Sequence, residues 1–210
     1  MAPPMDDLLL LILSSPSGAG KTTLTRRLLA RLPEFTFSVS HTTRKPRAKE
    51  VNGEDYHFVD RTRFEELVAN GAFAEWAEVH GNLYGTTLTE IDRARKQGCT
   101  GIIFDVDYQG ARQIKATRKE AVGIFILPPS LQELERRLRG RASDDEDTIR
   151  RRFDKSLVEI EHYPFFDYVL VNDDVEHAVA TLEGIVLAER TRRWRMAARA
   201  ELLLREGVVR

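Results

Sequence analysis

One stretch near the N-terminus reads Ser14-Ser15-Pro16-Ser17-Gly18-Ala19-Gly20-Lys21-Thr22-Thr23. Six apolar residues, Leu8 to Leu13, come before it, and a segment with apolar residues at helical spacing, Leu24 to Leu29, comes after it. A buried strand, a glycine-rich turn, Lys-Thr and a helix, in this order, are the layout of a phosphate-binding loop, or P-loop. The glycines let backbone N–H groups turn toward an anion, and the helix dipole adds to the attraction. The stretch therefore predicts a site for the phosphates of a nucleotide.

The residues of this loop have separate expected roles. Lys21 is expected to neutralise the β- and γ-phosphates, and the Thr22 hydroxyl to bind Mg²⁺. Ser15 replaces the usual leading glycine, with an effect that the sequence leaves open, while Gly18 and Gly20 supply the permissive backbone positions. The competing interpretation is an ordinary Ser/Gly-rich turn between a strand and a helix. The predicted nucleotide contacts in the loop are Ser15, Pro16, Ser17, Gly18, Ala19, Gly20, Lys21, Thr22 and Thr23.

Composition is that of an ordinary globular chain. Of its 210 residues, 42% are apolar and 31% are charged, which suits one α/β domain with insertions. The formal net charge of −1 gives no reason to expect nucleic acid or a membrane as a partner. Leu8–Leu13 is too short to span a bilayer and follows Asp6-Asp7, so it does not read as a signal peptide. With Cys99 as its single cysteine, the chain is expected in the reducing cytoplasm.

Short apolar runs next to helical segments predict a doubly wound, mainly parallel sheet in an α/β fold. Ligands bind such sheets at the carboxyl ends of the strands. We assign the sheet to a core of residues 6–40, 88–128 and 164–190. The predicted strands are Leu8–Ser14, Gly101–Val106, Val122–Leu127 and Tyr168–Asn172, with Phe35–Ser40 as a further strand.

Two insertions interrupt this core in a single domain that spans residues 1–210. Residues 41–87 are rich in Thr, Gly, Asn and aromatic residues, and only Thr62–Asn70 is predicted as a helix there, with Arg61 or Thr62 near its cap. Residues 129–163 are charged and helical, and Ser143 or Asp144 is the expected N-cap of their second helix. Residues 191–210 are predicted to be a solvated basic helix end without an assigned function.

A second anion site is predicted in the first insertion. Arg44 and Arg47 lie three residues apart around a proline, and Tyr56 and Tyr84 follow them in the chain. Arginine forks and phenol hydroxyls are donors suited to a phosphate monoester. The alternative is a solvated basic turn, which is what most charge clusters of this kind are.

Glu75 lies within an apolar and aromatic run, so its carboxylate needs partners. The N1–H and N2–H₂ edge of guanine is a paired donor that satisfies a carboxylate. Adenine presents an acceptor at N1 and leaves the carboxylate unpaired, which is how a site rejects the wrong base.

Six motifs in order resemble those of guanylate kinases, over roughly residues 6 to 190. They are Ser-Pro-Ser-Gly-Ala-Gly-Lys-Thr, Ser-His-Thr-Thr-Arg-Lys-Pro-Arg, Glu-Asp-Tyr, Glu-Trp-Ala-Glu-Val-His-Gly-Asn-Leu-Tyr-Gly-Thr, Asp-Val-Asp-Tyr-Gln-Gly and Val-Asn-Asp-Asp. The resemblance implies a P-loop core, a small mixed GMP-binding insertion at 41–87 and a helical lid at 129–163. It also implies the reaction of ATP with GMP to give ADP and GDP, with Mg²⁺ as cofactor.

The resemblance also implies roles for individual residues. Ser40 and Thr86 would contact guanine O6, and Glu75, helped by Asp107, the N1 and N2 edge. The family often has serine where Thr86 stands, and the hydroxyl is retained. Residues that would hold the GMP phosphate are Arg44, Arg47, Tyr56 and Tyr84. Residues that would act in catalysis are Lys21, Arg137, Arg141 and Arg152. Neighbouring arginines at 136, 139, 150 and 151 are expected to be solvated.

Three further assignments complete the set. Asp105 and Asp107 are two residues apart on the expected strand, so they are predicted to share one face. One of them would bind magnesium together with Thr22 and the other would contact the base, and the sequence leaves open which is which. Asn172 would contact adenine, and Asp173 or Asp174 would cap the next helix.

Two other functions compete with this one: a non-catalytic guanylate-kinase-like interaction module, and a kinase of a phosphorylated sugar. Lys21, Thr22, Arg137 and Arg141 favour an enzyme over the interaction module. Glu75 with Ser40 and Thr86 favours guanine over a sugar. The oligomeric state and the preference between GMP and dGMP are left open.

Overall fold

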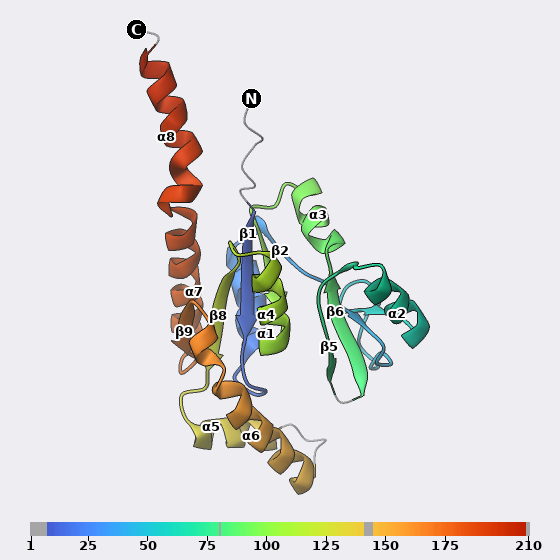
Figure 1. Ribbon diagram of the computed structural model, residues 1–210. Helices are drawn as coiled ribbons and strands as arrows, with labels where there is room; N and C mark the ends of the chain where they lie inside the picture. Colours follow the sequence, from blue (N-terminus) through green and yellow to red (C-terminus); the bar gives the residue numbers. More distant parts are fainter. Residues whose placement is uncertain (1–7, 80, 141–144, 209–210) are drawn as a thin grey trace.

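The larger sheet has five strands, all parallel, in the order β2-β7-β1-β8-β9. The computed structural model describes residues 8–79, 81–140 and 145–208 (Figure 1). Each strand lies in a segment predicted as a strand, which confirms a doubly wound, mainly parallel α/β fold. The strands are β1 (Leu9–Ser14), β2 (Phe35–Phe37), β7 (Gly101–Asp105), β8 (Val122–Leu127) and β9 (Tyr168–Val171).

Helices cover both faces of this sheet because alternate side chains of β1 point to opposite sides. Leu9, Leu11 and Leu13 pack in a core that includes residues of α1 and α7. Leu10 and Ile12 belong to a second core, which includes residues of α3 and α4. The four helices are α1 (Lys21–Arg31), α3 (Thr89–Lys96), α4 (Tyr108–Thr117) and α7 (Val175–Arg190).

A second sheet of four strands, in the order β4-β3-β6-β5, is built from the first insertion. It is mixed, because β3 pairs with β4 in parallel and with β6 antiparallel. The N-cap of helix α2 (Arg61–Ala69) is Asp60, whose carboxylate accepts the Arg63 N–H. Arg61 follows this cap directly, so its expected place near the cap is confirmed. The strands are β3 (His41–Thr42), β4 (His57–Phe58), β5 (Phe73–Val79) and β6 (Asn82–Thr87).

Gln113 of α4 fastens this sheet to the core. Its side-chain amide accepts from the Trp76 N–H at 3.0 Å and donates to the Trp76 carbonyl at 2.7 Å, so it mimics a strand partner at the edge of β5. The residue next to Trp76 in β5 is Glu75, and the contact therefore sets the position of Glu75 against α4.

The second insertion forms α5 (Leu131–Arg139), α6 (Glu146–Ile160) and the short 3₁₀ helix η1 (Tyr163–Phe165). The N-cap of α6 is Asp145, whose carboxylate accepts the Thr148 N–H at 2.7 Å. The prediction that Ser143 or Asp144 is this cap was wrong. Both residues lie outside the described part of the chain. Consecutive Ser and Asp residues are all competent caps, so local sequence does not select among them.

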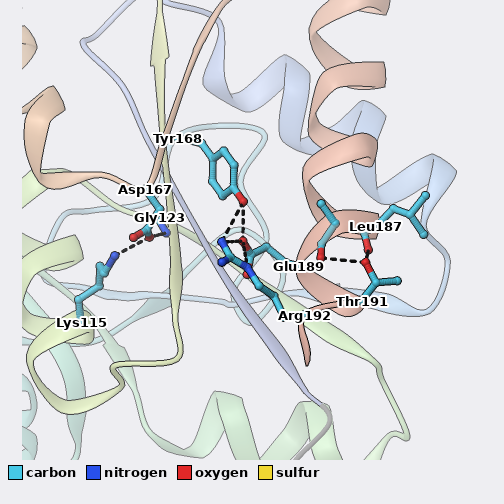
Figure 2. Close-up of polar contacts among 9 residues, drawn as sticks. Lys115, Gly123, Asp167, Tyr168, Leu187, Glu189, Thr191 and Arg192 are labelled. Carbon is cyan, nitrogen blue, oxygen red and sulfur yellow. Dashed lines mark hydrogen bonds and ion pairs between the residues drawn. The ribbon is translucent and has the colours of Figure 1, made fainter. Parts of the chain in front are cut away.

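The C-terminal segment was expected to be a solvated basic helix end, and most of its side chains from 191 to 206 are exposed. It forms a helix of its own, which was not expected. After α7 ends at Arg190, a new helix, α8 (Arg193–Val208), continues along the same side of the molecule and extends past the large sheet (Figure 1). Figure 2 shows the junction: Glu189, only 4% exposed, accepts from the Tyr168 hydroxyl at 2.5 Å and from Arg192 at 2.8 Å. Arg195 is also buried. The junction is thus anchored to β9.

Within the described ranges, none of the helices has both the length and the apolar character needed to cross a membrane.

Two glycine substitutions test the packing of the large sheet. A Cβ at Gly101 of β7 would lie 2.2 Å from the Phe35 ring, whereas a Cβ at Gly184 of α7 meets nothing within 4 Å. We expect Gly101→Ala to lower the free energy of unfolding by about 1–3 kcal/mol through overpacking. Gly184→Ala, the matched control, should raise it by about 0.5–1 kcal/mol because alanine favours helix. Urea unfolding measures both. Equal effects would contradict the close contact of Phe35 with β7.

Candidate functional site

The P-loop joins the end of β1 to the start of α1. Gly18 and Gly20 have φ of +94° and +96°, a conformation that other residues rarely adopt, so both predicted permissive positions are confirmed. Gly20 is the N-cap of α1 and has no side chain to cap the first turn. The backbone N–H groups of that turn therefore lack a local side-chain acceptor and carry the positive end of the helix dipole.

The P-loop is held by residues far away in the chain. The Ser17 N–H donates to the Glu159 carboxylate of α6 at 3.2 Å, and the Ser156 hydroxyl lies 3.4 Å from the Ser17 carbonyl. The Asn172 side chain donates to the Ala19 carbonyl at 2.7 Å, and the Ala19 methyl is fully buried in the core. The loop is thus fixed by contacts from α6 and from the residue that follows the last strand of the sheet.

Lys21 and Asp105 form an ion pair at the carboxyl ends of β1 and β7. The Lys21 ammonium also donates to the Val106 carbonyl at 3.1 Å. Asp107 does not share a strand face with Asp105, contrary to expectation, because β7 ends at Asp105. Asp107 instead caps α4, where its carboxylate accepts from the Gln109 and Gly110 N–H groups.

Ser40, Glu75 and Thr86 are brought together where the small sheet meets α4. The Ser40 and Thr86 hydroxyls lie 2.9 Å apart, and the Thr86 N–H donates to Glu75 at 2.7 Å. Glu75 is 5% exposed, and its Oε2 lies 2.8 Å from where a Cβ of Gly110 would be, so a larger residue there would displace the carboxylate. Burial raises the pKa of Glu75 to about 7, against the opposing effect of the Thr86 hydrogen bonds.

Three of the four residues predicted to bind the GMP phosphate, Arg44, Tyr56 and Tyr84, lie close together. The Arg44 guanidinium is 5.4 Å from the Tyr56 ring centroid, and the Tyr56 and Tyr84 rings are 6.1 Å apart. Arg44 forms a bidentate pair with Glu50 at 2.8 and 2.9 Å. The Arg47 side chain is 77% exposed, and its guanidinium lies 3.9 Å from the Glu50 carboxylate. The Arg47 backbone N–H also donates to Glu50.

One cleft of about 860 Å³ connects the P-loop with this cluster. Predicted residues that line it are Ser15, Pro16, Ser17, Gly18, Gly20, Lys21, Thr22, Thr23, Ser40, Arg47, Tyr56, Glu75, Tyr84, Asp105 and Asp107. The other predicted residues that the structure describes lie outside the lining: Ala19, Arg44, Thr86, Arg137, Arg152 and Asn172.

The lid arginines differ in their surroundings. Arg137 reaches the P-loop, where its guanidinium donates at 3.3 Å to the carbonyls of Ala19 and Asn172, and it also pairs with Glu133. Arg136 and Arg139 are exposed and pair with acids of their own helix, as expected. Arg152 lies half-buried in α6, and Arg141 falls outside the described residues.

Sequence reasoning missed several charged residues that line the cleft, among them Glu50, Lys155 and Glu159. Glu159 is 8% exposed and holds Ser17 across 142 positions of sequence. A signal was available, because Glu159 lies one helical turn beyond Ser156, on the side of α6 that carries its buried residues. A glutamate on a buried face requires a partner.

Comparisons with known proteins agree on one family. The sequence model described as guanylate kinase matches residues 8–189. The chain is 50% identical over 187 residues to a guanylate kinase of Geobacter metallireducens, covering 89% of this chain and 92% of that protein. It is 52% identical to a guanylate kinase of Myxococcus xanthus, covering 90% of each.

A solved structure, the guanylate kinase from Anaplasma phagocytophilum, is similar with a TM-score of 0.73 and 35% identity, over 90% of this chain and 89% of that one. The family model and these relatives each extend over most of the chain, through both sheets and the lid helices. The chain therefore belongs to the guanylate kinase family.

Proposed function

We propose that this protein transfers the γ-phosphoryl group of ATP to GMP, and to dGMP, giving ADP and GDP for the synthesis and recycling of guanine nucleotides. One observation carries the choice of acceptor: the buried carboxylate of Glu75 lines the same cleft as the P-loop. A carboxylate in this position accepts from the N1–H and N2–H₂ groups of guanine and has no such partner on adenine.

The acceptor oxygen of GMP is already ionised at neutral pH, so transfer needs positioning and charge neutralisation and no general base. On the donor side, the P-loop amides and Lys21 bind the phosphates of ATP. On the acceptor side, Arg44, Arg47, Tyr56 and Tyr84 bind the phosphate of GMP. Arg137, Arg141 and Arg152 act on the transferred group when the lid closes and excludes water.

Two residues, one in the first turn of α1 and one at the end of β7, would fit a magnesium ion. Thr22 and Asp105 both line the cleft and offer a hydroxyl and a carboxylate, the hard oxygen donors that Mg²⁺ prefers. Bound with ATP, Mg²⁺ supplies positive charge to the β- and γ-phosphate oxygens. Asp105, which pairs with Lys21 in the structure, would be free to bind the metal once the phosphates of ATP take its place beside Lys21. We assign the reaction to the cytoplasm, where ATP and GMP are available.

A coupled ADP-release assay across GMP, dGMP, AMP, CMP and UMP tests the function. We expect turnover with the guanine nucleotides and at least about 100-fold lower kcat/KM with the others, because the wrong base leaves Glu75 unpaired. Lys21→Ala should lower kcat by about 100-fold or more, since it removes a charge from the transferred phosphates. Comparable turnover of AMP and GMP would overturn the assignment of the base.

The two adjacent lid arginines provide a matched pair. Arg137→Ala should lower kcat and kcat/KM together by about 100-fold, because a guanidinium at the P-loop acts mainly in the transition state. Arg136→Ala removes an exposed partner of the same Glu133 and should change neither by more than about fivefold. Steady-state kinetics at saturating ATP measures both. Equal losses would mean that the general basic charge of the helix acts, not the placement of Arg137.

The raised pKa of Glu75 predicts the pH dependence of GMP binding. The ionised carboxylate accepts both guanine donors, so affinity should fall as the pH drops below about 7, by up to about tenfold per pH unit. The phosphate of GMP also titrates, near pH 6, and contributes equally to binding by the wild type and by a Glu75→Gln variant. The difference between these two proteins therefore isolates the effect of the Glu75 carboxylate. Titration calorimetry from pH 6 to 8 should show a steeper dependence in the wild type. Parallel curves would exclude Glu75 as the titrating group.

A further inference from the structure

Glu90, the second residue of α3, is a buried carboxylate that has no part in the site described above. It is 5% exposed and does not line the cleft. A buried carboxylate requires partners, and Glu90 has two. The Val39 N–H donates to Oε2 at 2.8 Å, and the Arg93 guanidinium donates to Oε1 at 3.2 Å and to Oε2 at 2.8 Å.

Val39 lies in the outgoing connection, residues 38–40, where the chain passes from the large sheet to the small one. On one side of it, the Ser38 N–H donates to the backbone of β7 at 3.0 Å, so Ser38 belongs to the large sheet. On the other side, the Ser40 carbonyl accepts from the backbone of β4 at 2.9 Å, so Ser40 belongs to the small sheet. Glu90 therefore binds the chain at the residue where it changes sheets.

The same helix also begins at the end of the returning connection, residues 87–89, which leads from β6 back to the core. Arg93, about one turn after Glu90, donates to the Phe37 carbonyl of β2 at 2.7 Å and to the Thr36 hydroxyl at 3.3 Å. Glu90 and Arg93 thus hold the start of α3 against the end of β2 and against Val39. The two connections between the core and the first insertion are fastened to each other by this pair.

Each connection leads directly to one of the two hydroxyls that we assign to guanine O6. Ser40 follows Val39, and Thr86 immediately precedes the returning connection. The two hydroxyls lie 2.9 Å apart. Groups that are already held at the right spacing lose less conformational freedom when a ligand binds, so the ligand binds more tightly. A contact that fastens the two connections should therefore raise the affinity for the base.

We propose that Glu90 is a positioning residue for the acceptor site: its hydrogen bond to Val39 sets Ser40 beside Thr86 and thereby sets the affinity for GMP. The inference rests on the proposed function, in which these two hydroxyls contact guanine. Neither connection includes a residue of the P-loop, so ATP binding does not depend on Glu90.

Two substitutions of Glu90 separate the hydrogen bond to Val39 from the charge opposite Arg93. Glu90→Gln keeps an oxygen at the same reach and loses the charge, so the KM for GMP should stay within about threefold of the wild-type value. Glu90→Asp keeps the charge but is one methylene shorter and no longer reaches the Val39 N–H. It should raise the KM for GMP by about tenfold, the scale of one hydrogen bond to a charged group.

Steady-state kinetics with GMP and ATP varied in turn measures these effects. In Glu90→Asp, kcat and the KM for ATP should both stay within about twofold of the wild-type values, because the P-loop and the lid arginines are untouched. Titration calorimetry with GMP alone should show the same loss of affinity as the KM. Glu90→Ala, which removes both contacts, should raise the KM for GMP at least as much as Glu90→Asp does.

Asp60→Ala is the matched control within the same insertion. The Asp60 carboxylate caps α2 and accepts the Arg63 N–H at 2.7 Å, so its truncation also removes a hydrogen bond between a carboxylate and the backbone. It should lower the Tm and leave the KM for GMP within about twofold of the wild-type value.

Three results would overturn the proposal: an unchanged KM for GMP in Glu90→Asp, equal increases in Glu90→Gln and Glu90→Asp, or a rise in the KM for ATP that matches the rise for GMP. The comparison of the Gln and Asp variants decides the question even if Glu90→Ala does not fold. Absence of GMP phosphorylation by the wild type would instead reject the proposed function, and it is measured before any variant is made.

Discussion

The conformation of the P-loop is the constraint on which the rest of the structure depends. Two glycines at positive φ create a turn suited to an anion, within which the Ala19 N–H donates to the Pro16 carbonyl at 3.2 Å. Contacts from other parts of the chain add to this hydrogen bond. Glu159 of α6 and Asn172, directly after β9, hold the loop in place, and the buried methyl of Ala19 packs in the core. The large sheet and the lid are therefore parts of the phosphate site as well as its frame.

The acceptor half of the site depends on a second kind of restraint. Glu75 is buried on an edge strand, and that strand is held to α4 through the backbone of Trp76 by Gln113. Gly110 of the same helix leaves room for the carboxylate, and Thr86 donates to it. The helix α4 begins at Tyr108, shortly after β7 ends at Asp105. The contacts with α4 therefore also fix the position of Glu75 relative to β7. The same strand, β7, thus positions residues of both the ATP site and the GMP site.

Local patterns predicted most of the fold because each buried strand is a short apolar run and each glycine of the P-loop precedes a helix. The prediction that Asp105 and Asp107 share one strand face was wrong. The strand ends at Asp105 and Asp107 already caps α4, so the alternation of side chains along a strand does not extend to Asp107. The cap of α6 could not be chosen among adjacent acids. Glu159 was missed because its partner in the loop is the Ser17 backbone N–H, which leaves no trace in side-chain motifs and is distant in sequence. Glu50 was missed because its main partner, the Arg44 guanidinium, was assigned to phosphate alone.

The pairing of Arg44 with Glu50 has a consequence for how this site selects its ligand. Three cations assigned to phosphate, Lys21, Arg44 and Arg137, each hold a carboxylate of the same chain. An arriving phosphate therefore exchanges with a resident carboxylate instead of meeting an uncompensated charge. Such an exchange releases few salt ions, so binding should depend less on ionic strength than a count of arginines implies. Anions without a guanine base do not pair with Glu75, so they gain little binding free energy from this exchange. Other polyanions of the cell should therefore bind weakly in the cleft.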